Sequence, residues 1–375
     1  MKIILLTNIV PPYRQRAYGM LARLVHACNP ARNPDGDFHV ICTQRQEPQR
    51  AWPMLTGDFA QSILPGIKIP LGENRVIPIN FGLIRALDAA RPDVLILAGF
   101  GLAQWQAHLY ARRNNIPTIL QFDGWAGSDA TYQNRLRDCI RKTMIAHAKI
   151  CIAAGENGQD WFVKSGKVRN DILIAPIPPS FTAPNHLPGF DDRPVDLLWC
   201  GRPTLSKGFE TFLEIAAGLH RQGHAKRIQI VGTCDQNDLA NRLAGLGLSK
   251  ATDHMPEIPP AKLPGIYQQT KLCLLPSRND AYGVTVIEAI ACGTVALASN
   301  RVGCVPDILG TAEIPPCNIV PAWMTACARL LSDRAAWQKT QARQHSRIAN
   351  NTPAHHAETI LRACKMATSA EVPDA

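Results

Sequence analysis

The chain has 375 residues, a formal net charge of +10 and 46% hydrophobic residues. This length exceeds what one hydrophobic core normally supports, so we expect two domains. The longest apolar run, around residues 94–103, is much shorter than the roughly 20 residues of a membrane-spanning helix, so we expect a cytoplasmic protein, soluble or peripheral to the membrane. The twelve cysteines form no C-x-x-C pair and no zinc-spaced cluster with histidines, which argues against a metal site and a disulfide scaffold.

Short apolar runs alternate with helical patterns along most of the chain. The first run follows Met1 and is broken by Thr7 and Asn8, so we interpret it as a strand and not as a signal peptide. Similar runs occupy residues 37–42, 93–97, 117–122, 149–154 and 227–232. This alternation predicts an α/β protein with parallel, doubly wound sheets. A proline-rich span at 176–194 is the best candidate for a linker.

Positive charge is concentrated in the first half of the chain. Residues 1–190 hold 21 Lys and Arg against 13 Asp and Glu, whereas the remainder holds 19 against 17. Arg135, Arg137, Arg141 and Lys142 fall on a predicted helix that ends near His147. Such a face could meet anionic lipid headgroups or a polyprenyl diphosphate, or it could be an ordinary solvated helix face. Nucleic acid is a weaker alternative, because no helix-turn-helix, finger or RNP pattern is present.

Two cations flank one loop in the segment LLWCGRPTLSKG, residues 197–208. Gly201 and Arg202 follow a short predicted strand, and Lys207 precedes the next helical pattern. A guanidinium can grip phosphate oxygens with two hydrogen bonds and an ammonium adds a compact charge, so the pair could neutralise a diphosphate. Taken alone, the two side chains could equally be solvated surface charges.

Two carboxylates flank a glycine in the segment SRNDAYGVTVIEAIACG, residues 277–293. The preceding residues 271–276 read as a buried strand, and residues 284–291 have the propensities of a helix. Gly283 would then lie at the strand-to-helix turn, where backbone N–H groups and the helix dipole favour phosphate. Glu288 lies about one turn further along and could accept from ribose hydroxyls, and Asp280 could accept from sugar hydroxyls.

These two segments together resemble retaining GT-B glycosyltransferases of glycosyltransferase family 4, also called glycosyl transferases group 1. The usual E-G-F-G-x-x-x-x-E-A-M-A-x-G motif reads here D-A-Y-G-V-T-V-I-E-A-I-A-C-G, with Asp280 in place of the usual Glu. The G-R-x-x-x-x-K-G loop keeps its spacing, and residues 153–166 also resemble a segment of the family. The resemblance implies a GT-B fold, in which two Rossmann-like domains face each other across a cleft.

From the resemblance we expect an N-terminal acceptor-binding domain at 1–185 and a C-terminal nucleotide-sugar-binding domain at 186–355. A C-terminal helix and tail at 356–375 would pack back on the N-terminal domain. The expected donor-binding residues are Gly201, Arg202, Lys207, Asp280, Tyr282, Gly283, Val284 and Glu288. Arg202, Lys207 and Asp280 are also expected to take part in catalysis.

The N-terminal half contributes three further candidates. Asp123 stands where the family commonly has a histidine that faces the transferred sugar, although its Asp-Gly pair is also typical of a plain turn. The loop after the first strand often carries glycines in the family. Here Pro11 and Pro12 offer no N–H to a phosphate, which leaves Tyr13 and Arg14 as acceptor-side candidates.

The resemblance implies a retaining, metal-independent hexosyltransferase with no cofactor beyond its nucleoside diphosphate sugar donor. Its acceptor would be a glycan or a polyprenyl-linked sugar, in the assembly of a cell-surface polysaccharide or glycolipid. Two alternatives stay open. One is a nucleotide-sugar epimerase of the same fold, and the other is a catalytically silent subunit that binds nucleotide sugar.

Overall fold

The computed structural model describes residues 1–28, 37–46, 57–70, 76–129, 134–256 and 258–369. The chain divides into two compact units. Unit 1 comprises residues 1–123, 129–177 and 352–375, and unit 2 comprises residues 124–128 and 178–351. The division therefore falls at residue 177, inside the proline-rich span, and the chain returns to unit 1 at residue 352. Residues 370–375 of the expected C-terminal tail lie outside the described residues.

Unit 1 contains a parallel sheet in the strand order β3-β2-β1-β6-β7-β8-β9. Its strands are β1 (Ile3–Thr7), β2 (Phe38–Cys42), β3 (Ala60–Ile63), β6 (Val94–Ala98), β7 (Thr118–Phe122), β8 (Ile150–Ala153) and β9 (Ile172–Ile174). Its helices are α1 (Pro12–Ala27), α3 (Leu83–Ala90), α4 (Leu102–Arg113), α6 (Arg135–His147), α7 (Glu156–Lys164) and α15 (Pro353–Thr368).

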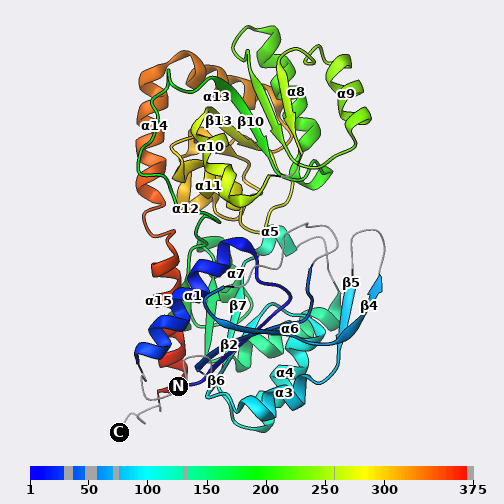
Figure 1. The fold of residues 1–375 in the computed structure, drawn as a ribbon, viewed down its shortest axis with the longest axis vertical. Coiled ribbons are helices and arrows are strands. Elements are labelled where there is room, and N and C mark those ends of the chain that lie inside the picture. The colour runs from blue at the N-terminus through cyan, green and yellow to red at the C-terminus, as the bar shows by residue number, and fades with distance from the viewer. Residues whose placement is uncertain (29–36, 47–56, 71–75, 130–133, 257, 370–375) are drawn as a thin grey trace. The chain divides into compact units, whose positions relative to one another are not determined.

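Side chains that alternate along β1 build a separate core on each face of the unit 1 sheet. Ile3 and Leu5 pack with buried residues of α1 and α15, whereas Ile4 and Leu6 pack with those of α3, α4 and α6. All four are essentially inaccessible to solvent. A strand buried on both faces needs a continuous apolar run, which explains why β1, β2, β6, β7 and β8 could be predicted from the sequence, whereas β3 and β9 were not. The helices α1 and α15 lie side by side although they stand at opposite ends of the chain (Figure 1).

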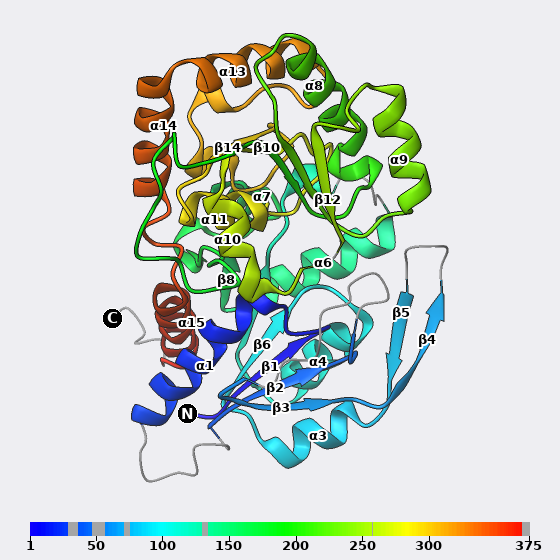
Figure 2. The same ribbon diagram turned by 45° about the horizontal axis from the view of Figure 1, so that its top comes forward.

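A two-stranded antiparallel ribbon, β4 (Gly66–Pro70) and β5 (Val76–Asn80), stands apart from the main sheet of unit 1 (Figure 2). Ile67 pairs with Ile79 and Ile69 with Ile77, so all four isoleucines share one face of the ribbon. Ile67, Ile69 and Ile77 are 56%, 41% and 41% exposed. We did not predict this ribbon from the sequence.

Unit 2 contains a second parallel sheet, in the order β12-β11-β10-β13-β14. Its strands are β10 (Val195–Cys200), β11 (Ile228–Val231), β12 (Thr252–Met255), β13 (Thr270–Leu275) and β14 (Val295–Ala298). Its helices are α8 (Phe209–Arg221), α9 (Gln236–Gly245), α10 (Leu263–Gln268), α11 (Val284–Ala291), α12 (Val305–Ile308), α13 (Val320–Ser332) and α14 (Arg334–Arg347), and the short α5 (Ala126–Asp129) straddles the boundary between the two units.

The helices α8, α9 and α13 cover one face of the unit 2 sheet (Figure 2). Their aromatic and leucine side chains form the core there. Trp199 of β10 packs against Phe209 and Phe212 of α8 in this core. The helices α10, α11 and α14 pack against β13 and β14. The two central strands, β10 and β13, are neighbours, so the loops that follow them meet at the carboxyl edge of the sheet. In open parallel sheets this edge is where ligands bind.

Candidate functional site

The first candidate loop follows β10. Gly201 directly succeeds the strand, Arg202 is half-buried, and Lys207 ends a short 3₁₀ turn at Leu205–Lys207. Gly208 is the N-cap residue just before α8. Its φ is 78°, a left-handed conformation that glycine adopts without strain. A side chain at Gly208 would also collide with the carbonyl of Pro276 in the neighbouring loop. The glycine therefore lets the two loops after β10 and β13 lie against each other.

The second candidate loop follows β13 and leads into α11. Gly283 is the N-cap residue just before this helix and has φ of 94°, and a side chain there would collide with Val302. The first N–H groups of an α-helix have no intrahelical partner, and the helix dipole places positive potential beside them. Val284 and Thr285, at the start of α11, are partly exposed. This turn is therefore a suitable place for a phosphate group.

Hydrogen bonds join the two loops within unit 2. The N–H groups of Arg278 and Asn279 donate to the carbonyl of Ser206 at 2.9 and 3.2 Å. The Thr285 hydroxyl, in the first turn of α11, donates to the carbonyl of Cys200 at 3.3 Å. The loop that carries Lys207 and the helix that begins at Gly283 are thus fixed relative to each other.

Lys207 and Asp280 form an ion pair at this junction. The Lys207 Nζ lies 2.6 Å from Asp280 Oδ2, and the two side chains are 27% and 11% exposed. The backbone of Asp280 is held as well, because its N–H donates to the carbonyl of Arg301 at 3.0 Å and its carbonyl accepts from the Trp125 indole at 3.0 Å. The two charges that the sequence placed 73 residues apart are therefore brought together.

Glu288 lies on α11 and is only 7% exposed. Its Oε1 accepts hydrogen bonds from the N–H of Ser180 at 3.2 Å and from the Ser180 hydroxyl, and its Oε2 accepts from the Tyr267 hydroxyl at 3.2 Å. Burial raises the pKa of the Glu288 carboxyl above its usual value, although the hydrogen bonds from Ser180 and Tyr267 oppose this effect. Within unit 2, the predicted ribose-binding carboxylate is thus hydrogen-bonded to Ser180, which lies in the proline-rich span just after the unit boundary at residue 177.

Tyr282 has its side chain in the interior of unit 2. It is 4% exposed, and its hydroxyl accepts a hydrogen bond from Asn351 Nδ2 at 2.9 Å. Its carbonyl accepts from the N–H of Cys304 at 2.8 Å. The structure thus gives the Tyr282 side chain a packing environment, whereas the neighbouring Gly283 and Val284 lie at the turn itself.

The candidates of the N-terminal half are in unit 1. Asp123 directly follows β7, and Tyr13 and Arg14 lie in the first turn of α1, which begins at Pro12. Arg14 is only 3% exposed and forms an ion pair with Asp123. The sequence analysis expected Arg14 to face an acceptor, but the structure places its guanidinium in the interior, against Asp123 and His356.

The predicted basic face of α6 is smaller than the sequence suggested. Arg137 and Arg141 both form ion pairs with Asp129. Arg141 is 8% exposed, and its guanidinium lies over the rings of Phe100, Phe122 and Trp161, where the aromatic faces attract a cation. Arg135 and Lys142 stay exposed. The interpretation of all four as one surface patch was therefore wrong.

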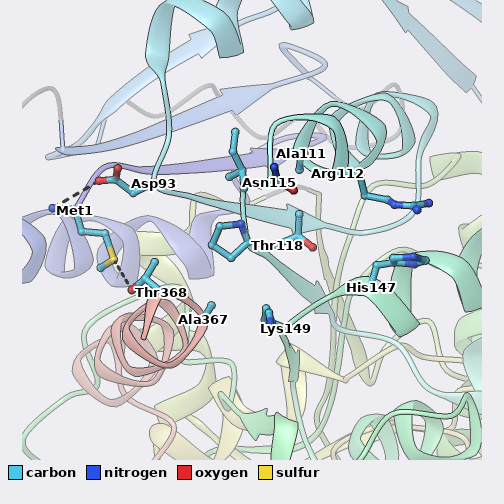
Figure 3. A pocket seen from close by; sticks show the side chains of 12 residues that line it. Met1, Asp93, Ala111, Arg112, Asn115, Thr118, His147, Lys149, Ala367 and Thr368 are labelled. Atoms are coloured by element: carbon cyan, nitrogen blue, oxygen red, sulfur yellow. Dashed lines mark hydrogen bonds and ion pairs between the residues drawn. The ribbon is translucent and has the colours of Figure 1, made fainter. Parts of the chain in front are cut away.

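A cavity of about 710 Å³ in unit 1 lies at the end of its sheet where the strands β6, β7 and β8 begin (Figure 3). Asp93, Thr118 and Lys149 line it where β6, β7 and β8 begin. Arg112 and His147 line it from the last turns of α4 and α6, and the Arg112 guanidinium there complements the negative end of the α4 dipole. The basic side chains therefore have a structural explanation, and we assign no ligand to this cavity.

Sequence reasoning missed several contacts of the candidate site. Trp125 and Ser128 belong to unit 2, where Ser128 accepts through its carbonyl from Asn279 Nδ2 at 3.4 Å. Ser180 and Tyr267, the partners of Glu288, carry no local motif. The Asp-Gly-Trp triplet at 123–125 was the only signal for this region, and it indicated a turn without indicating a partner.

Comparison with known proteins identifies relatives of the second half of the chain. Residues 188–351 match the family model described as glycosyl transferases group 1. The D-inositol 3-phosphate glycosyltransferase of Gordonia bronchialis is 29% identical over 172 residues, which is 42% of this chain and 38% of that protein. The chain thus matches about two fifths of the length of the first curated relatives.

Solved structures resemble the chain over almost its full length. HepE of Anabaena, in complex with UDP, has a TM-score of 0.73 at 12% identity, covering 96% of this chain and 99% of HepE. Sucrose-phosphate synthase of Thermosynechococcus elongatus has a TM-score of 0.69 at 15% identity, covering 96% of this chain and 98% of that chain. The GT-B fold predicted from the sequence is confirmed by these structures.

Proposed function

We propose that the protein transfers a sugar from a nucleoside diphosphate donor to an acceptor, because residues 188–351 match the family model of glycosyl transferases group 1 and the chain has the GT-B fold. The observation that carries this proposal is the junction of Lys207, Asp280 and the start of α11 at Gly283. A compact cation and a row of backbone N–H groups there suit the two phosphates of such a donor.

Each residue of the junction has a proposed role. Lys207 and Arg202 neutralise the diphosphate, and the N–H groups that follow Gly283 cradle it. Glu288 accepts from the ribose hydroxyls, and Asp280 positions the sugar. A bound diphosphate would compete with Asp280 for the Lys207 ammonium, because both are anionic and the present Nζ–Oδ2 distance is only 2.6 Å. Donor binding would thus free the Asp280 carboxylate to accept from the sugar.

The reaction breaks the bond between the anomeric carbon and a diphosphate oxygen and forms one between that carbon and an acceptor hydroxyl oxygen, whose proton is released. Negative charge grows on the diphosphate as this bond breaks, and fixed cations beside it stabilise the transition state more than the bound donor. We propose that the protein's own cations supply this charge, without a divalent metal, and that the anomeric configuration is retained. Proton NMR of the product anomer tests retention, and activity in the presence of EDTA tests metal independence.

The donor and the acceptor are proposed from the relatives. HepE was solved with UDP and with UDP-glucose, which makes a UDP-hexose the first donor to test. Several curated relatives are named D-inositol 3-phosphate glycosyltransferases. We propose a glycan or polyprenyl-linked acceptor, in the assembly of a cell-surface polysaccharide or glycolipid.

We further propose peripheral contact with an anionic membrane. No helix among the described residues is long and apolar enough to cross a bilayer. The exposed Arg135 and Lys142 of α6 and the isoleucine face of the β4–β5 ribbon, Ile67 to Ile79, offer charge and apolar surface for an interface. Co-sedimentation with anionic and neutral vesicles tests this contact. Equal binding to both kinds of vesicle, or no loss of vesicle binding in an R135Q/K142Q variant, would exclude an electrostatic contribution to membrane binding.

The decisive experiment for the function combines binding and turnover. A thermal-shift panel of UDP-, GDP- and ADP-sugars identifies the donor, since a ligand at 100 times its dissociation constant stabilises by about 2.7 kcal/mol. Donor consumption is then followed with and without an acceptor extract. Consumption that requires an acceptor supports a transferase. Conversion of the donor to an epimer, or binding without any consumption, would favour the epimerase or the silent subunit.

A further inference from the structure

Three side chains from distant parts of the sequence form a cluster inside unit 1. Arg14 lies on α1, Asp123 directly follows β7, and His356 lies on α15. The two ends of the Arg14 guanidinium have different partners, because Nη2 donates to Asp123 Oδ1 and Nη1 donates to a ring nitrogen of His356. With its side-chain amide turned so that the oxygen faces Arg14, Gln121 accepts from Nη1 at 2.7 Å.

The surroundings of His356 define which of its ring nitrogens carries the proton. Nδ1 lies 3.0 Å from the carbonyl oxygen of Pro176, which can only accept, so Nδ1 carries the hydrogen. Nε2 then has a free electron pair, which is what the Arg14 N–H requires. His356 is completely buried, and burial together with the charge of Arg14 holds the pKa of its ring well below the usual range. The ring is therefore a neutral acceptor at physiological pH.

Asp123 is held through one of its two carboxylate oxygens. Oδ1 accepts from Arg14, whereas Oδ2 has no hydrogen-bond partner among the residues that the structure describes. The Asp123 side chain is 33% exposed, in contrast to 3% for Arg14. The cluster thus runs from a buried histidine through a buried arginine to a carboxylate that reaches solvent.

We propose that Arg14 is a positioning residue for Asp123, and that His356 of the C-terminal helix α15 fixes Arg14 by accepting from its guanidinium. An arginine between a carboxylate and a neutral histidine has one orientation that satisfies both partners, because its N–H groups form a rigid fork. Asp123 is then presented with Oδ2 outward, where a sugar hydroxyl can donate to it. Only this last step rests on the proposed function. The hydrogen bonds within the cluster do not depend on it.

A double-mutant cycle tests whether His356 acts through Asp123. The variant H356L replaces the imidazole with an apolar side chain of similar volume and so removes the acceptor. The variant H356Q supplies an amide oxygen that can accept from Arg14 in its place. We expect H356L to lower kcat on the order of 100-fold, as small misplacements of reacting groups do. We expect H356Q to stay within a few-fold of the wild type, and R14K to behave like H356L, because an ammonium lacks the fork.

The same substitutions in a D123A background distinguish positioning from general stability. If His356 and Arg14 act through Asp123, H356L and R14K lower kcat no further in that background. Equal losses in both backgrounds, or a D123A variant as active as the wild type, would overturn the proposal. Thermal unfolding of each variant identifies any that fails to fold, in which case H356Q and R14K carry the comparison.

A second measurement is independent of catalysis. Nitrogen-15 NMR of the histidine side chains at neutral pH should find His356 neutral, with its proton on Nδ1. A charged ring, or a proton on Nε2, would overturn the proposal even in an active enzyme. If the protein transfers no sugar but His356 has the expected tautomer, the proposed function fails and the cluster remains as the geometry describes it.

Discussion

Replacing Glu288 with glutamine should raise the stability of the protein while weakening donor binding. Glu288 is 7% exposed, and its hydrogen-bond partners, Ser180 and Tyr267, are uncharged. Burial raises the pKa of this carboxyl in the folded protein. A carboxyl with a raised folded pKa contributes stability that is present below its unfolded pKa and lost as the pH rises through its folded pKa. At neutral pH the charge is therefore buried at a cost, and E288Q removes it while keeping an acceptor for Ser180.

The magnitude of the binding effect follows from the change in hydrogen-bond type. Hydrogen bonds to a charged group are worth about 1.5–3 kcal/mol and neutral ones about 0.5–1.5 kcal/mol. The loss of roughly 1–2 kcal/mol in ribose binding corresponds to about 5- to 30-fold weaker donor affinity. Calorimetric titration measures the affinity, and thermal unfolding from neutral to acidic pH measures the stability. The gain in stability should shrink as the pH falls toward the usual carboxyl range of about 4.

Glu313 provides a matched control in the same unit. It is also buried, but it forms an ion pair with Arg343 at 2.5 Å and accepts from the N–H of Gly310 at 2.9 Å. E313Q removes the charge that Arg343 pairs with and should lower stability at neutral pH, with donor affinity unchanged. A less stable E288Q at neutral pH would refute the claim that the buried charge of Glu288 costs stability. An unchanged donor affinity would refute the assignment of Glu288 as a ribose-binding carboxylate.

Two further predictions concern charges elsewhere in the chain. D280N should bind a nucleoside diphosphate several-fold more tightly than the wild type, because the Asp280 carboxylate competes with the diphosphate for Lys207. The variant should transfer sugar more slowly, because the same carboxylate positions the sugar. Weaker diphosphate binding in titrations would contradict this prediction. His108 is buried without a partner for either ring nitrogen among the described residues, and burial lowers its pKa from 6.5 to about 4. As the pH falls, His108 is therefore protonated in the unfolded chain before it is protonated in the folded protein. The free energy of unfolding should fall as the pH drops from about 6.5 to 4, and it should fall less steeply in H108Q.

The sequence predicted those elements whose signal is local. The strands of the two sheets that are buried on both faces appear as continuous apolar runs, and the predicted helix at 284–291 coincides with α11. The motifs placed Lys207 and Asp280 after predicted strands of the second half, and the structure makes these strands neighbours and joins the two side chains. The exposed β4–β5 ribbon was missed because its isoleucines alternate with Lys68 and prolines, without the run that marks a buried strand.

The remaining contacts depend on chain reversals that no local pattern encodes. Arg14 and His356 are 342 residues apart, so the sequence could not reveal that the last helix buries the arginine. Glu288 and Ser180 are 108 residues apart, and the sequence therefore left Glu288 open to a ligand although it already has partners in unit 2. Arg141 read as a surface charge because the aromatic rings around it come from β7, α7 and the segment before α4.

The most direct test of the central claim is the rate of donor cleavage at saturating donor in K207A, with K250A as a control. Lys250 is an exposed lysine of the same unit, outside the two loops. If Lys207 stabilises the departing diphosphate, K207A should cleave the donor on the order of 100- to 1000-fold more slowly, with a smaller loss of donor affinity, while K250A matches the wild type. A K207A variant that cleaves the donor within threefold of the wild-type rate would contradict the account.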